Sequence, residues 1–132
     1  MYSSRLLKLI LLKGEFAVCQ LDADSGPPDW VFNGDFYSIT RTSDEISFIC
    51  RQDQLPGSQP CEPGWRILEI KGPFNFNEIG VLSSLLEPLA SAGISILAIS
   101  TYNTDYLLVK KHHLDQAILV LQTNGHEIEQ QE

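Results

Sequence analysis

The feature that most constrains this chain is an internal repeat within its 132 residues. Residues 9–14 read Leu-Ile-Leu-Leu-Lys-Gly, and residues 67–72, 58 positions later, read Ile-Leu-Glu-Ile-Lys-Gly. Residues 40–49 align without a gap on residues 100–109, with hydroxyl residues, an acid and an apolar strand in the same order. Two copies of one small unit predict a pseudo-symmetric pair, and a groove between two such copies suits a small ligand. A similarity of composition between two strand-rich halves is the alternative.

The length and charge of the chain narrow its architecture and its partners. Two independent cores of about 60 residues would each be only marginally stable, so we expect the halves to share one core. The net charge is −8, from 17 acidic and 9 basic residues. This charge argues against nucleic acid and against an anionic membrane as partners, because both favour a basic protein surface. A small anion or zwitterion held at one local site is compatible with it.

Segment composition and cysteine usage predict a cytoplasmic protein. The apolar run 6–12 is short, contains Lys8 and is not followed by a small-residue cleavage site, so we expect no signal peptide. No stretch approaches the roughly 20 apolar residues of a membrane span. The cysteines Cys19, Cys50 and Cys61 form no close pair and lack metal-type spacing, which predicts reduced thiols. Cys19 and Cys50 are expected in the core and Cys61 in a loop.

The first half is predicted to consist mainly of strands. Apolar runs separated by turn signals predict strands at residues 5–12, 15–21, 36–41 and 45–51. Residues 29–32 are predicted to form one helical turn, ended by Asn33 and Gly34. Residues 55–64, rich in Pro and Gly, are the expected linker between the halves.

The second half is predicted to contain two helices. Apolar residues at the spacing of one helix face predict a helix over 78–92, capped by Asn77 and ended by Gly93. Pro88 lies inside this pattern and is expected to bend the last turn and free a carbonyl near Ser84. The other predicted elements are strands at 65–71, 94–101, 105–111 and 126–129 and a helix from 114 that stops at 124–125. This order predicts an antiparallel sheet with both helices on one face, of which the first half is a degenerate copy lacking the long first helix.

Several segments carry a resemblance to a known family. Residues 98–109, Ala-Ile-Ser-Thr-Tyr-Asn-Thr-Asp-Tyr-Leu-Leu-Val, resemble the signature of ACT domains of the aspartokinase-like, tandem type. Residues 80–90, followed by Gly-Ile-Ser-Ile at 93–96, are similar to the same family. In the first half, residues 14–21 and 40–47 resemble the N-terminal partner unit. The resemblance covers nearly the whole chain, and it extends to stand-alone bacterial tandem ACT proteins and to the tandem units of cytosolic arginine sensors.

This resemblance implies an α+β fold of two ferredoxin-like (βαββαβ) ACT units, with antiparallel sheets and helices on one face. Residues 1–60 would form a degenerate N-terminal ACT-like unit, and residues 61–132 the C-terminal ACT unit. ACT units pair edge to edge and bind amino acids at the seam, near the loop before the first helix. The resemblance thus implies a homodimeric regulatory module that senses a free amino acid and acts on an unidentified regulated protein. A family member of known ligand usually has an enzyme or signalling complex attached, which leaves the ligand and the partner open here.

The residues suggest how an amino acid would be held. Its carboxylate would bind backbone N–H groups at a helix N-terminus, where Gly80 permits close approach. Its ammonium would face Asp105, for which Glu45 is the repeat mate. Tyr102, Phe74 and Phe76 would form a wall for its side chain, and Thr42, Ser43 or Glu45 would close the other side. The alternatives are local roles: a turn residue for Asp105, helix packing for Gly80, a surface aromatic for Tyr102 and turn formation for residues 42 and 43. The candidate ligand-binding residues are Asn77, Glu78, Ile79, Gly80, Val81, Leu82, Thr101, Tyr102, Asp105, Thr42, Ser43 and Glu45.

Other chemistry finds little support in the sequence. His112 and His113 are adjacent in the chain and His126 lies beyond the helix stop, so we expect no metal site. No Gly-rich phosphate loop and no nucleophile–base set is evident, so we expect no cofactor and no enzyme activity. The alternative to amino-acid sensing is a structural or protein-interaction module with an empty ancestral pocket, and a small enzyme is a third hypothesis.

Overall fold

The computed structural model describes residues 6–57, 60–72 and 79–132. The chain forms two compact units: residues 14–65, and residues 1–13 together with 66–132. The expected boundary between residues 60 and 61 stays a prediction. The elements in chain order are β1 Lys8–Leu11, β2 Phe16–Asp22, η1 Asp29–Phe32, β3 Ser38–Arg41, β4 Glu45–Arg51, η2 Gln52–Gln54, β5 Cys61–Ile70, α1 Ser83–Ser91, β6 Ile96–Ser100, β7 Asp105–Lys110, η3 Lys111–His113, α2 Leu114–Thr123 and β8 Glu127–Gln130, where η marks a 3₁₀ turn.

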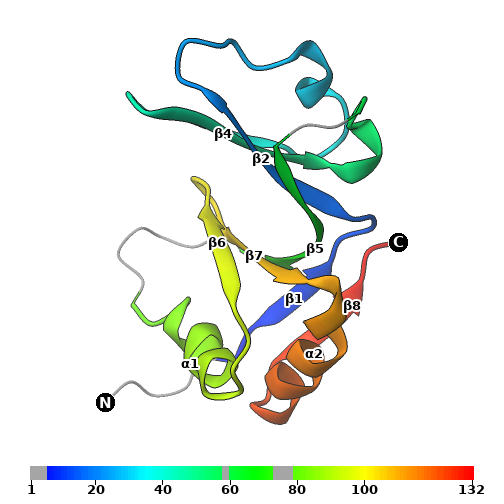
Figure 1. The fold of residues 1–132 in the computed structure, drawn as a ribbon. Coiled ribbons are helices and arrows are strands. Elements are labelled where there is room, and N and C mark those ends of the chain that lie inside the picture. Colours follow the sequence, from blue (N-terminus) through cyan, green and yellow to red (C-terminus); the bar gives the residue numbers. More distant parts are fainter. Residues whose placement is uncertain (1–5, 58–59, 73–78) are drawn as a thin grey trace. The chain divides into compact units, whose positions relative to one another are not determined.

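The unit that contains both α-helices has the N-terminal strand in the interior of its sheet. Its strand order is β8-β1-β5-β7-β6, so β1 separates the last strand from β5 (Figure 1). Leu9 pairs with Ile70 in antiparallel β5 and with Ile128 in parallel β8. The sequence predicted antiparallel sheets, and the β1–β8 pair departs from that pattern. A strand this dense in Leu and Ile suits an interior position, because it is paired on both edges.

The two helices cover one face of that sheet. Alternate residues of β1, β5 and β7 point toward them, while the residues between point to the opposite face, as the pleat of a strand requires. The helices contribute Leu85, Leu89, Ala117 and Leu121, all fully buried. Together these side chains form the core of the unit, and the strand residues that pack in it are Leu9, Leu11, Leu68, Ile70, Leu107 and Val109.

The first helix begins later than the sequence predicts. The prediction was a helix over 78–92, whereas α1 begins at Ser83. Gly80 has φ of 84°, a left-handed conformation that interrupts a right-handed helix. Asn77, the predicted cap, lies outside the described residues, and no side chain caps the observed N-terminus at Leu82. The predicted end is confirmed, because Gly93 adopts φ of 75° just after the helix.

The other unit consists mainly of strands, as predicted for the degenerate copy. Its antiparallel sheet has the order β3-β4-β2-β5, with the first residues of β5 at its edge. Within its described residues the helical elements are two short 3₁₀ turns, η1 and η2. The turn predicted at 29–32 is confirmed as η1, where Val31 is fully buried beside Phe48 and Ile46.

The cysteines differ from the sequence expectation. Cys19 of β2 and Cys61 of β5 are directly paired across the two strands and form a disulfide, so the prediction of reduced thiols is wrong for both. Cys61 begins a strand instead of lying in a loop. The sequence did not indicate this disulfide, because the two cysteines are 42 positions apart and are brought together by the register of their strands. Cys50 is free and buried in the core, as predicted, and burial followed by the charge of Asp53 raises its thiol pKa.

The hairpins that carry the second repeat segment share one turn geometry. The N–H of Thr42 donates to the carbonyl of Glu45 at 2.9 Å, and the N–H of Thr101 donates to that of Thr104 at 2.8 Å. In each turn the threonine hydroxyl oxygen accepts a backbone N–H from the far side. The turns therefore correspond with an offset of 59, not 60, and Glu45 is not the structural counterpart of Asp105.

Candidate functional site

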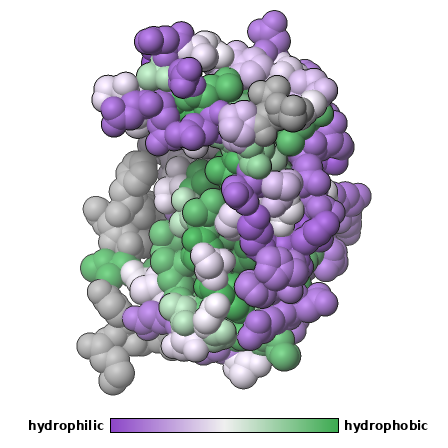
Figure 2. Space-filling view, in the orientation of Figure 1, coloured by the Kyte–Doolittle hydropathy of each residue, from purple (hydrophilic) through white to green (hydrophobic). Residues whose placement is uncertain are grey.

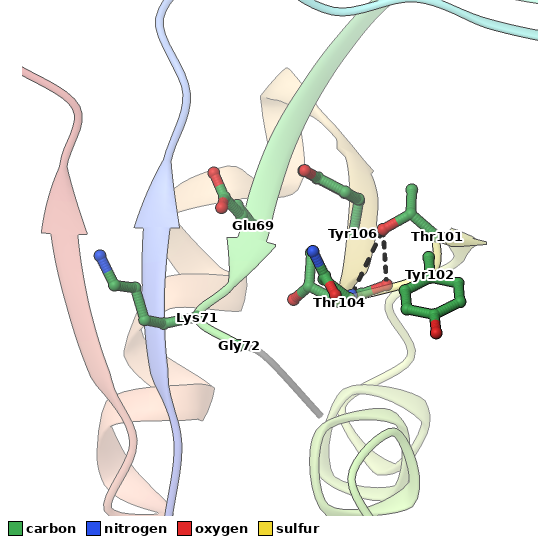
Figure 3. Close-up of a pocket in the computed structure, with 8 residues that line it drawn as sticks. Glu69, Lys71, Gly72, Thr101, Tyr102, Thr104 and Tyr106 are labelled. Carbon is green, nitrogen blue, oxygen red and sulfur yellow. Dashed lines mark hydrogen bonds between the residues drawn. The ribbon is translucent and has the colours of Figure 1, made fainter. Parts of the chain in front are cut away.

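A hollow of about 490 Å³ lies in the unit that contains the α-helices, on the sheet face away from them. Its floor is the end of β5, and its wall is the turn between β6 and β7 (Figure 3). Tyr106, the second residue of β7, points into the space between them. The residues that line the hollow are Glu69, Lys71, Gly72, Thr101, Tyr102, Asn103, Thr104 and Tyr106.

The floor of the hollow, at the end of β5, is in close contact with its wall, the β6–β7 turn. The hydroxyl of Thr104 donates to the carbonyl of Ile70, which joins the turn to the end of β5. A Cβ atom added to Gly72 would lie 2.5 Å from the carbonyl oxygen of Asn103. Real side chains essentially never approach so closely, so the main chain at this position has room only for glycine. The shape of the hollow therefore depends on the Lys-Gly pair that ends the repeat motif.

Two opposite charges line the floor. Glu69 and Lys71 are two residues apart in an extended segment, so their side chains project from the same face. Among the described residues, neither charged group takes part in a hydrogen bond or salt bridge. Burial raises the pKa of Tyr106, and the negative charge of Glu69 raises it further. The hollow thus has one cationic and one anionic group whose charges have no hydrogen-bond or salt-bridge partner in the part of the chain that the structure describes.

The structure brings two of the predicted ligand residues to this hollow. Thr101 and Tyr102 line it, and Tyr102 is 79% exposed. Sequence reasoning missed the charged floor. The signal was present in the strand predicted at 65–71, where Glu69 and Lys71 alternate with apolar residues and therefore mark its polar face.

Asp105 has a local partner. The hydroxyl of Ser100, its cross-strand neighbour, donates to its carboxylate at 2.5 Å. In β7 it alternates with Tyr106, so it shares the face of Leu107 and not the face of the hollow. The local role that the sequence left open for Asp105 is therefore observed, and its role in binding an ammonium group stays a prediction.

The residues before α1 are divided between surface and core. Ile79 is 75% exposed, whereas Val81 is buried and Leu82 packs against the core. Outside the described residues lie Phe74, Phe76, Asn77 and Glu78. Binding of a carboxylate by the main chain of this segment stays a prediction.

The three candidates of the other unit have local roles in its β3–β4 turn. The hydroxyl oxygen of Thr42 accepts the N–H groups of Asp44 and Glu45, at 3.1 and 3.2 Å. Ser43 is a central residue of this turn. The carboxylate of Glu45 accepts a hydrogen bond from the Gln20 amide at 3.2 Å. Their joint action with residues of the second half stays a prediction.

The described residues contain no group of three or more His, Cys, Asp or Glu side chains arranged to hold a metal ion. The rings of His112 and His113 lie 4.2 Å apart and tilted by 51°. In the same part of the chain, no helix has the length and apolar character needed to cross a membrane.

Comparison with known proteins identifies one domain of the chain. A family model described as an ACT domain matches residues 61–123. Residues 61–123 therefore form an ACT domain. A second model, described as an N-terminal domain, matches residues 14–58, which lie within the β-rich unit. The hollow and both flanks of its turn therefore fall inside the matched ACT domain.

Individual relatives extend this match. The human "cytosolic arginine sensor for mTORC1 subunit 1" is 42% identical over 59 residues, which are 44% of this chain but only 18% of that protein. A crystal structure of an Agobacterium tumefaciens protein is 36% identical, covers 97% of this chain and 96% of its own, and has a TM-score of 0.91. The ligand-free regulatory subunit of aspartate kinase from Thermus thermophilus is 13% identical, with 89% and 96% covered and a TM-score of 0.61. The last similarity shows the fold alone.

Proposed function

We propose that this chain is a regulatory module that binds a free amino acid, with the hollow at the end of β5 as its site. The observation that carries the proposal is the pair of opposite charges, Glu69 and Lys71, without partners among the described residues. An amino acid is a zwitterion, and a pair of opposite charges on one face complements its two charged groups. The human relative is named as an arginine sensor, which supports amino-acid sensing as the class of function.

The chemistry of capture follows from the lining. The Lys71 ammonium would bind the ligand carboxylate, and the Glu69 carboxylate would bind the ligand ammonium. Each such charge-assisted hydrogen bond contributes about 1.5–3 kcal/mol net. The earlier assignment, with the main chain of 77–82 for the carboxylate and Asp105 for the ammonium, is a competing proposal for the same family of ligands. The comparison of Asp105→Asn with Glu69→Gln decides between them.

We also propose that the module is a homodimer that pairs through β6. This strand is hydrogen-bonded to β7, and within the described residues its other edge has no strand partner. It has no charged residue, and both Leu97 and Ala98 are exposed. Figure 2 shows hydrophobic side chains gathered over this part of the visible face. An uncharged exposed edge strand favours pairing with another strand, and a closed two-fold dimer is the commonest result.

Light scattering tests the dimer. One chain has a mass of 14.8 kDa, and a dimer has twice that mass. Ala98→Lys should shift the protein toward the monomer, because a charge on the edge opposes strand pairing. Leu119→Lys, at an exposed position on α2, is the control and should leave the dimer intact. The monomer mass for the parent at micromolar concentration would refute the dimer.

A thermal-shift screen with the twenty amino acids, followed by calorimetry, tests ligand binding. We expect a ligand-specific rise in melting temperature that falls sharply in Glu69→Gln and in Lys71→Gln. The control is Glu87→Gln, on the exposed side of α1, which should bind like the parent. If Asp105→Asn abolishes binding and the two floor variants do not, the Asp105 assignment is correct instead. No response to any amino acid would favour an interaction module with an empty pocket.

A further inference from the structure

We infer that the amino acid bound in this hollow has an uncharged, hydrogen-bonding side chain. The inference rests on the proposed function and adds the class of ligand to it. Its basis is the charge balance of the lining: Glu69 and Lys71 contribute one charge of each sign. Both charges are needed by the α-ammonium and α-carboxylate groups that every free amino acid has. None is left among the described lining residues for a charged side chain.

The orientation of the ligand follows from where the charges lie. Glu69 is in β5 and Lys71 directly follows its end, whereas the opposite wall is the turn between β6 and β7, as Figure 3 shows. A ligand whose α-groups lie over β5 therefore directs its side chain toward that turn. The wall that meets the side chain is uncharged and rich in hydroxyl and amide groups, and its residues are Thr101, Tyr102, Asn103, Thr104 and Tyr106.

This wall favours hydrogen-bonding groups over charged groups. Hydroxyl and amide groups donate and accept hydrogen bonds, so they complement an amide or hydroxyl on the ligand. A side-chain guanidinium, ammonium or carboxylate would lose part of its hydration without gaining an opposite charge. The volume of about 490 Å³ is open to side chains of any size, so charge and not size is the basis of discrimination. Arginine, which the human relative is named for, is therefore not the expected ligand.

Matched pairs of ligands test the inference on the full-length chain by calorimetry. The probes are glutamine with glutamate, asparagine with aspartate, and citrulline with arginine, because each pair is nearly equal in shape and differs in charge. We expect the neutral member of whichever pairs bind to bind about tenfold or more tightly than the charged member, a difference of about 1.4 kcal/mol.

One variant should remove the expected preference for citrulline over arginine. Asn103→Asp places a carboxylate in the turn at nearly constant shape, and it should raise the affinity for arginine relative to citrulline by about tenfold. Asn33→Asp, an exposed position in the other unit, is the control and should leave the ratio unchanged.

The outcomes separate the inference from the proposed function. If the parent binds a charged amino acid more tightly than its neutral partner, the inference is wrong and the proposed function stands. If neither the parent nor Asn103→Asp binds any of these probes or any of the twenty amino acids, the proposed function and the inference both fail. A preference for the neutral members in the parent, together with its loss for the arginine–citrulline pair in Asn103→Asp, supports both.

Discussion

The Nε2 atom of His126 lies 3.1 Å from the carbonyl oxygen of Ser84. Ser84 is four residues before Pro88, which has no N–H to donate to that carbonyl. The sequence predicted a freed carbonyl near Ser84, and the buried imidazole bonds to it. The Nδ1 atom of the same ring accepts the N–H of Leu7 at 3.1 Å, so the ring proton is on Nε2 and is donated to Ser84. One neutral histidine thus satisfies a helix carbonyl and a backbone N–H ahead of β1.

This relationship predicts coupling between positions 88 and 126. His126→Leu should lower the free energy of unfolding by about 2 kcal/mol or more, because it leaves the Ser84 carbonyl and the Leu7 N–H without partners. In a Pro88→Ala background the loss should be smaller by about 1 kcal/mol, since the alanine N–H restores the helix hydrogen bond. Urea denaturation of the four proteins of the double-mutant cycle measures this. Strictly additive costs would show that the two groups do not share the carbonyl.

Gly72 should be intolerant of any side chain. Gly72→Ala brings a Cβ to 2.5 Å from the Asn103 carbonyl, so the turn must move. We expect a loss of about 1–3 kcal/mol in the free energy of unfolding, together with loss of amino-acid binding. Gly26→Ala is the matched control, because nothing lies within 4 Å of its added Cβ. Equal stability of the two variants would mean that the close approach at Gly72 is not maintained in solution.

The disulfide should be a large part of the stability of the β-rich unit. It joins residues 42 positions apart, and the loop-entropy relation gives about 4 kcal/mol as the upper range of its contribution. Cys19→Ser with Cys61→Ser, or a dithiol reductant, should therefore lower the free energy of unfolding by about 2–4 kcal/mol. Cys50→Ala is the control that retains the response to reductant. If reductant does not change the urea midpoint of the parent, the bond contributes nothing to folding.

The ionisation of Tyr106 should report on the charge of Glu69. Burial and then the Glu69 carboxylate raise the pKa of Tyr106 above its usual value near 10. Glu69→Gln should lower that pKa part of the way, because the charge is removed while burial remains. Ultraviolet titration measures it, with Tyr106→Phe to assign the transition and Glu87→Gln as control. An unchanged titration in Glu69→Gln would place the carboxylate too far from the tyrosine hydroxyl to act on it.

The elements that sequence reasoning predicted well are those with local signals. Helix α2 follows from its apolar spacing and its Asn-Gly stop, and η1 from a four-residue run before Asn33 and Gly34. For the bond between Ser84 and His126, the sequence predicted the free carbonyl but not its partner, because a proline in a helix always leaves one carbonyl without its N–H donor. These inferences use information that lies within a few residues.

The elements that sequence reasoning missed depend on pairing between distant segments. No residue near Cys19 indicates that Cys61 faces it, because this pairing depends on the register of β2 against β5. Likewise, Glu69 and Lys71 line a hollow only because the fold brings the β6–β7 turn beside them. The late start of α1 has a local cause, because the left-handed conformation of Gly80 interrupts the helix. The sequence suggested this glycine as a point of close approach for a ligand.

The interior position of β1 has a consequence for the order of events during translation. Lys8 emerges from the ribosome well before its strand partner Glu127, because the two residues are far apart in the chain. The β-rich unit, residues 14–65, has its strand pairs within its own span and is complete long before then. The nascent chain therefore contains the complete β-rich unit while the edge of β1 that pairs with β8 is still unpaired. We expect the nascent chain to need chaperones most in the interval before β8 leaves the ribosome, and no longer once β8 can pair with β1.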